Sequence, residues 1–311
     1  MVRVTLQQVV GFSYALMAMV LYGIYMVPRK KSNISQGSFT FWMGFGILIT
    51  SSAIGFIMEK GTPAVNIPQY LLILASGIVW GTGTLAYSSA VKHIGLSRST
   101  PIKNTSAILG TLAGIICFHE FGFQKVIPLL MVILGSIAIV ISATILGRIE
   151  SFDRGDEDGG TPSVLVGVLC SIWAAVAYSI YTIPMKITYA QGISPSAFLF
   201  YMGHGCFIGM TLLSLILKTH LSPTRSPWRD RGLAMLSGLM WAVGSLCANL
   251  AVKIIGVAVT WPLTKNTVVA IAYGVLILKE VDTVKYRSSL RIGIILSVAG
   301  VLLLAYAMQE Q

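Results

Sequence analysis

Long runs without charge constrain the fold of this chain more than any other feature. Only 11% of its 311 residues are charged and 55% are hydrophobic, whereas a soluble domain carries about 25% charged residues. An α-helix needs roughly 17 to 25 apolar residues to cross the hydrocarbon core of a bilayer. The sequence therefore predicts an all-α integral membrane protein with ten transmembrane helices, in the runs 4–28, 32–58, 61–91, 100–118, 126–147, 159–185, 187–217, 232–252, 257–278 and 292–308.

The net charge of +11 fits this interpretation, because the basic residues lie mainly between the apolar runs. Fifteen of the 22 Lys and Arg residues fall in the connections between helices 1–2, 3–4, 5–6, 7–8 and 9–10, and five fall in the other connections and the termini. The positive-inside rule then places both termini outside. The bilayer is the expected partner of such a surface, and no nucleic acid is expected.

The two halves of the chain resemble each other. The segment Tyr22–Lys30 matches Tyr178–Lys186, and Ser76–Trp80 matches Ser237–Trp241. A charged, glycine-containing linker at 148–161 would separate a first five-helix repeat, 1–147, from a second one, 162–311. Because five is an odd number, the second repeat must lie upside down relative to the first.

Inverted repeats of this kind are typical of secondary transporters. Their substrate sites lie near the bilayer midplane at the repeat interface, often on interrupted helices. The repeat therefore favours a carrier that works by alternating access. A membrane sensor or scaffold without transport activity is the alternative from another class, and it has less need of this symmetry.

Several motifs in both halves carry a family resemblance. They are Pro28–Lys30, Ser76–Gly83, Ile94–Ile102, Phe118–Glu120, Gly238–Gly244 and Leu278–Glu280. With these motifs the chain resembles the glucose/ribose porter (sugar uptake) family of the drug/metabolite transporter superfamily, and more distantly the rhamnose–proton symporter. The resemblance implies a ten-helix carrier that takes up a sugar or sugar derivative and is coupled to protons.

Two polar motifs, Ser99–Ser106 and Thr260–Thr267, interrupt apolar spans at matching places. Each holds a lysine, and a lysine at the centre of a membrane helix costs about 2.5–3.5 kcal/mol on insertion scales. We expect the polar side chains of these motifs to bind substrate; the alternatives are snorkelling lysines and helix–helix hydrogen bonds. The candidates are Lys103, Asn104, Thr105, Lys265, Asn266 and Thr267.

The lysines depart from the sugar-porter pattern, in which small hydroxyl residues are commoner at these positions. A sugar acid is therefore a possible substrate beside a neutral sugar. The alternative function within transport is an exchanger of organic anions or phosphorylated sugars.

Aromatic side chains are the second group of candidates for binding. Flat apolar faces combined with a few polar groups suit small-molecule sites, although tryptophan also marks membrane interfaces and tyrosine often serves only packing. The substrate-binding candidates of this kind are Trp80, Trp241, Trp261, Tyr25 and Tyr181.

Proton coupling requires a group that titrates inside the membrane. His204 is the first candidate because it lies within an apolar run and titrates near neutral pH. Glu120 and Glu280, at matching span ends, are the next candidates. The alternative for His204 is a structural role, and for the two glutamates it is anchoring or bridging to a nearby lysine. Because proline blocks the preceding helical turn, helix breaks are expected at Pro28, Pro101, Pro184 and Pro262.

The sequence lacks the motifs of common enzyme classes, such as a nucleophile elbow or a phosphate-binding loop. Its four cysteines have no metal-ligand spacing. We therefore expect no catalytic residues, no cofactor and no metal. The expected ligands are a small-molecule substrate and, for a coupled carrier, a proton.

Overall fold

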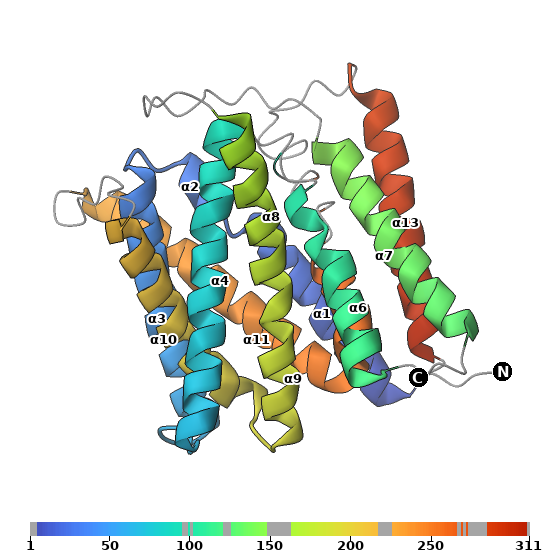
Figure 1. Cartoon of the computed structure of the whole chain (residues 1–311), viewed down its shortest axis with the longest axis horizontal. Helices are drawn as coiled ribbons and strands as arrows, with labels where there is room; N and C mark the ends of the chain where they lie inside the picture. Colours follow the sequence, from blue (N-terminus) through green and yellow to red (C-terminus); the bar gives the residue numbers. More distant parts are fainter. Residues whose placement is uncertain are drawn as a thin grey trace.

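The computed structural model describes residues 5–94, 99, 102–120, 126–147, 163–216, 226–265, 269, 272 and 285–309, and every regular element in this part of the chain is a helix. The helices form one bundle (Figure 1). They are α1 (Leu6–Ile24), α2 (Val27–Lys30), α3 (Gln36–Met58), α4 (Ile67–Ile94), α6 (Ser106–Phe118), α7 (Val126–Gly147), α8 (Val164–Ile180), α9 (Thr182–Ala190), α10 (Pro195–Ile216), α11 (Trp228–Thr264) and α13 (Arg287–Gln309).

Seven spans in the described residues are long and apolar enough to cross a membrane. They begin at Leu6, Gly37, Ile67, Val126, Val164, Trp228 and Arg287. Large apolar side chains are exposed on the outside of the bundle, where lipid would cover them; Ile57 is 73% exposed and Leu165 is 69% exposed. These findings confirm the prediction of a multi-pass integral membrane protein. The predicted span 257–278 is described without gaps only up to residue 265, so the number ten stays a prediction.

Two of the predicted helices are each divided by a short break. The break between α1 and α2 falls at Tyr25 and Met26, just before Pro28, and the one between α8 and α9 falls at Tyr181, before Pro184. A proline close to the start of a helix costs little, because the first N–H groups have no partner within the helix. The two breaks therefore leave Tyr25 and Tyr181 at equivalent points of the two halves.

The predicted helices 232–252 and 257–278 meet at a kink in α11, where Gly256 is non-helical and a second helical segment, 257–264, begins. The φ of 78° and ψ of 168° at Gly256 suit glycine, which has no Cβ to clash. The break thus lies at Gly256 and not at Pro262, which is inside the helix. Pro262 cannot donate to the carbonyl of Ala258, and that carbonyl instead accepts a hydrogen bond from Thr111 Oγ1 at 3.3 Å.

The helices pack in matching pairs. α1 packs against α11 and α8 against α4, while α3 packs against α10 and α7 against α13. Helices that hold equivalent places in the two halves run in opposite directions (Figure 1). This is seen for α1 and α8, for α4 and α11, and for α7 and α13.

Small residues permit two close helix crossings in equivalent places. A Cβ added to Gly77 of α4 would lie 2.9 Å from the Cα of Gly205 in α10, and one added to Gly238 of α11 would lie 2.9 Å from the carbonyl carbon of Gly46 in α3. Such contacts between backbones are how membrane helices gain packing energy without a hydrophobic driving force. The two crossings join α4 to α10 and α11 to α3 in matching places.

Candidate functional site

Two tryptophans from α4 and α11 meet where these helices approach each other. The rings of Trp80 and Trp241 have centroids 4.1 Å apart, and each residue is 3% exposed. Tyr178 from α8 lies 5.9 Å from Trp80, and Tyr22 from α1 lies 6.5 Å from Trp241. The sequence candidates Trp80 and Trp241, which are far apart in the chain, therefore belong to one aromatic centre.

The same hydrogen bond occurs twice beside these rings. The hydroxyl of Tyr22 bonds with Ser245 Oγ at 2.8 Å, and the hydroxyl of Tyr178 donates to Thr84 Oγ1 at 3.1 Å. Ser245 follows Trp241 by one helical turn, as Thr84 follows Trp80. Sequence reasoning missed both hydroxyl residues, although their equal spacing from the repeated tryptophans was a usable signal.

Both intramembrane lysines point toward aromatic faces. Lys265 Nζ lies 5.6 Å from the ring of Tyr22, 5.5 Å from that of Tyr178 and 4.7 Å from that of Trp261. Lys103 Nζ lies 4.7 Å from the ring of Tyr87. Cation–π contacts of this kind are worth about 0.5–2 kcal/mol, more when water is excluded.

No carboxylate of the described residues pairs with either lysine. Cation–π contacts with these rings offset only part of the free energy that it costs to place a lysine in the membrane. The arrangement thus leaves a positive region that a polar or anionic ligand would stabilise.

Trp261 fixes the second segment of α11 against the neighbouring helices. Its indole N–H donates to the carbonyl of Tyr178 at 3.1 Å, and Tyr181 packs edge-on at 5.1 Å. The ring lies so close to Gly110 of α6 that an added Cβ there would be 2.0 Å from Trp261 Cδ1. These contacts bury both predicted binding residues, since Trp261 is 1% and Tyr181 3% exposed.

Several buried polar groups in the bundle have no hydrogen-bond partner among the described residues. Asn104 is 1% exposed, and neither its amide nitrogen nor its amide oxygen is hydrogen-bonded. The same holds for Ser106 Oγ and for the amide nitrogen of Asn249 in α11, which sequence reasoning missed. Unpaired buried polar groups are rare in native proteins and call for an explanation such as a ligand. Thr105, in contrast, bonds to the carbonyl of Ile102 at 2.7 Å.

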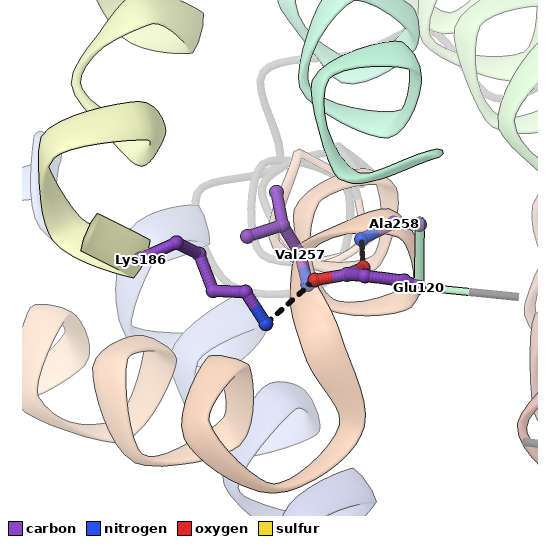
Figure 2. Close-up of polar contacts among 4 residues, drawn as sticks. All are labelled: Glu120, Lys186, Val257 and Ala258. Carbon is purple, nitrogen blue, oxygen red and sulfur yellow. Dashed lines mark hydrogen bonds and ion pairs between the residues drawn. The ribbon is translucent and has the colours of Figure 1, made fainter. Parts of the chain in front are cut away.

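Glu120, at the end of α6, makes three polar contacts with other elements (Figure 2). Its two carboxylate oxygens accept hydrogen bonds from the N–H groups of Val257 at 2.8 Å and Ala258 at 2.7 Å. Lys186 of α9 forms an ion pair with the same carboxylate at 2.9 Å. The side chain of Glu120 is 5% exposed and that of Lys186 is 24% exposed.

Local backbone geometry directs Glu120 toward α11. Helix α6 ends at His119, whose φ of 51° lies in the left-handed region, and the N–H of Glu120 bonds back to the carbonyl of Gly114 at 3.3 Å. This is the usual hydrogen-bonding pattern of a helix C-terminus. A Cβ on Gly256 would lie 2.6 Å from Glu120 Oε2. Glycine at 256 is therefore needed both for its backbone angles and for the approach of the carboxylate.

His204 lies apart from these contacts. Its Nδ1 bonds with the carbonyl of Phe200, one turn earlier in α10, at 2.7 Å. Its ring packs against the rings of Phe200 and Tyr201 of the same helix, at 5.0 and 6.3 Å. These contacts fit a structural role and leave its predicted coupling role untested.

The remaining candidates differ in what the structure describes. Tyr25 packs against the aromatic centre and lies 6.5 Å from Tyr22. Lys265 contacts the rings of Tyr22 and Tyr178, which each precede a predicted binding tyrosine, Tyr25 or Tyr181, by three residues. Pro101, Asn266, Thr267 and Glu280 lie outside the described residues.

Comparison with known proteins identifies the family. The model of the family described as "Sugar transport protein" matches residues 13–307. The chain belongs to this family. A putative sugar uptake protein of Listeria innocua is 28% identical, and the glucose uptake protein GlcU of Bacillus subtilis is 26% identical; each alignment covers 94% of this chain and 97% of the relative.

A solved crystal structure supports the fold alone. Its chain is 13% identical to this one and superposes with a TM-score of 0.72, covering 96% of this chain and 97% of the other. Similarity to the rhamnose–proton symporter stays a prediction.

Proposed function

We propose that the protein is a secondary transporter that takes up a sugar or sugar derivative by alternating access. The observation that carries this proposal is the convergence of Lys265, Trp80 and Trp241 with tyrosines from α1 and α8 at the centre of a membrane bundle. The relatives named as sugar and glucose uptake proteins support the substrate class. We regard the protein as a carrier and not as an enzyme because of its family, and not because enzyme motifs are missing from its sequence.

The proposal includes two five-helix inverted repeats, 1–147 and 162–311. Three observations support them: the paired packing of helices, their opposite directions, and the duplicated bond of Tyr22 with Ser245 and of Tyr178 with Thr84. Each of these bonds joins the first helix of one half to the third predicted helix of the other. An axis between Trp80 and Trp241 would relate the two halves.

We assign each proposed binding residue a contact with the sugar that suits its side chain. Trp80, Trp241 and Trp261 offer flat faces to a sugar ring, and Asn104 offers one acceptor and two donor hydrogens for hydroxyl groups. Because the tryptophans are nearly inaccessible, the structure would correspond to a state in which neither side of the membrane reaches the site.

Uptake into proteoliposomes tests the proposal directly. Purified protein is reconstituted and supplied with labelled D-glucose, D-ribose, D-gluconate and D-glucuronate, with and without a pH gradient. We expect at least one of these sugars to accumulate or to exchange against internal unlabelled sugar. If none moves faster than in protein-free vesicles under any gradient, the proposal is contradicted.

Proton coupling forms part of the proposal, with His204, Glu120 and Glu280 as candidate groups. For His204, replacement by glutamine tests the role, because glutamine keeps hydrogen-bonding capacity and cannot carry the charge. We expect uptake by this variant to lose its dependence on the pH gradient. An unchanged dependence would assign the coupling to another group.

An anionic sugar is a second candidate substrate, favoured by one specific observation. Lys103 and Lys265 are half-buried and have no acidic partner among the described residues, so a carboxylate or phosphate of the substrate would offset their two charges. In the same uptake panel, faster transport of gluconate or glucuronate than of glucose would favour this candidate. Transport of glucose alone would exclude it and leave the proposed sugar carrier intact.

A further inference from the structure

Glu120 follows α6, which ends at the end of the bundle where α1 begins (Figure 1), and its carboxylate contacts Lys186, Val257 and Ala258 (Figure 2). We propose that Glu120 is a positioning residue for transport. Its carboxylate holds the second segment of α11, residues 257–264, in the arrangement in which this end of the bundle is closed. The inference rests on the proposed carrier function, and it adds a contact that the binding site itself does not use.

The position of the carboxylate follows from the break in α11. Because the helix restarts after Gly256, the N–H groups of Val257 and Ala258 have no carbonyl partner within their own segment. The start of a helix also carries a partial positive charge of about +0.5. Glu120 meets both needs, since one oxygen accepts from each N–H group.

The segment that Glu120 holds is the one that carries the candidate binding residues. Trp261 lies one turn beyond Val257 and Lys265 follows directly after Thr264. Gly114 and Gly110 of α6 allow this segment to lie flat on α6, with the backbone of Ala258 over Gly114 and the ring of Trp261 over Gly110. Any shift of residues 257–264 along α6 would therefore move Trp261 and Lys265 together.

Lys186 extends the contact to a third element. Its ammonium group pairs with the carboxylate from α9, and it lies 5.7 Å from the ring of Phe118 at the end of α6. Helix α6 belongs to the predicted first repeat, whereas α9 and α11 belong to the second. If this end of the bundle opens by separating the two repeats, the bonds of Glu120 must break.

A set of variants separates the hydrogen bonds that Glu120 accepts from Val257 and Ala258 from its charge attraction to Lys186. Glu120→Gln keeps the shape and one acceptor but loses the charge, and Lys186→Gln leaves both backbone hydrogen bonds in place. The double reversal Glu120→Lys with Lys186→Glu restores the attraction without restoring an acceptor for the two N–H groups, because lysine only donates.

Two readouts apply to each variant: the maximal rate and KM of D-glucose and D-glucuronate transport in proteoliposomes, and hydrogen exchange of the peptide covering 253–262. For Glu120→Gln we expect a maximal rate at least tenfold lower, a KM within twofold of wild type and faster exchange in this peptide. For Lys186→Gln we expect a loss of two- to fivefold, and for the double reversal no recovery.

Normal rate and exchange in Glu120→Gln would overturn the inference, and so would recovery of transport by the double reversal. If a variant does not reach the membrane, the wild-type protein still decides. Saturating D-glucose or D-glucuronate, whichever is transported, should speed exchange of the 253–262 peptide, and unchanged exchange would overturn the inference. A wild type that transports no sugar would contradict the proposed function instead.

Discussion

At the scale of single residues, Asn104 separates binding from packing most clearly. Its buried amide has no partner among the described residues, and an unsatisfied buried polar group costs about 1–3 kcal/mol. We therefore expect Asn104→Leu to leave the thermal stability of the protein unchanged or raised, and to lower sugar uptake at least tenfold. Thr105→Val is the control, since the Thr105 hydroxyl already donates to the carbonyl of Ile102, three residues earlier in the chain. Uptake by Asn104→Leu within twofold of wild type would assign the amide to the protein interior.

Lys265 yields a second prediction at this scale. It contacts three rings, whereas Lys103 contacts one in the described structure. Replacing Lys265 by glutamine removes a charge near the proposed site, so we expect the KM for a sugar to rise at least tenfold with normal membrane insertion. Lys31→Gln, at an exposed position, is the matched control. Equal kinetics in Lys265→Gln and wild type would show that the lysine only anchors its helix.

The sequence predicted many of these residues but not their neighbours. Lysine inside an apolar run and repeated tryptophans are visible because they break a pattern. Asn249, Ser245 and Thr84 do not stand out, because a small polar residue in a membrane helix commonly serves helix packing. The approach of Glu120 to Val257 joins positions far apart in the chain, and only the folded bundle brings them together.

At the scale of elements, the break in α11 depends on Gly256. Alanine there would take strained backbone angles, at a cost of order 1–3 kcal/mol, and its Cβ would also meet the Glu120 carboxylate. Gly192 has a φ of +88° with nothing within 4 Å of an added Cβ, so Gly192→Ala isolates the backbone strain. We expect Gly192→Ala to keep most of the uptake and Gly256→Ala to lose at least tenfold. Similar uptake by the two variants would contradict the need for the carboxylate contact.

The positions of the helix breaks were predicted from the sequence only in part. Pro28 and Pro184 indicated the interruptions of the first and sixth predicted spans, because proline constrains the turn before it. In the ninth predicted span, 257–278, a break was expected at Pro262, yet Pro262 lies inside the helix and the kink lies just before this span, at Gly256. Thr111 satisfies the carbonyl that Pro262 leaves free, and α6 thereby lets the helix continue through the proline.

At the scale of the whole molecule, the orientation in the membrane can be tested from two exposed lysines. Lys31 follows α2 and Lys60 follows α3, at opposite ends of the bundle (Figure 1). The excess of basic residues on the side of Lys31 predicts that this side faces the cytoplasm. In a variant without the native cysteines, a membrane-impermeant thiol reagent applied to intact cells should label Lys60→Cys. Lys31→Cys should be labelled only after permeabilisation.

The same experiment decides which side Glu120 closes. Helix α6 runs toward the end of the bundle where α1 begins and α13 ends (Figure 1), and the predicted orientation makes this the outer side. Glu120 and Lys186 would then close the path from outside, and sugar arriving from outside would have to find them apart. Labelling of Lys31→Cys in intact cells, with Lys60→Cys protected, would reverse the orientation and place this contact on the cytoplasmic side.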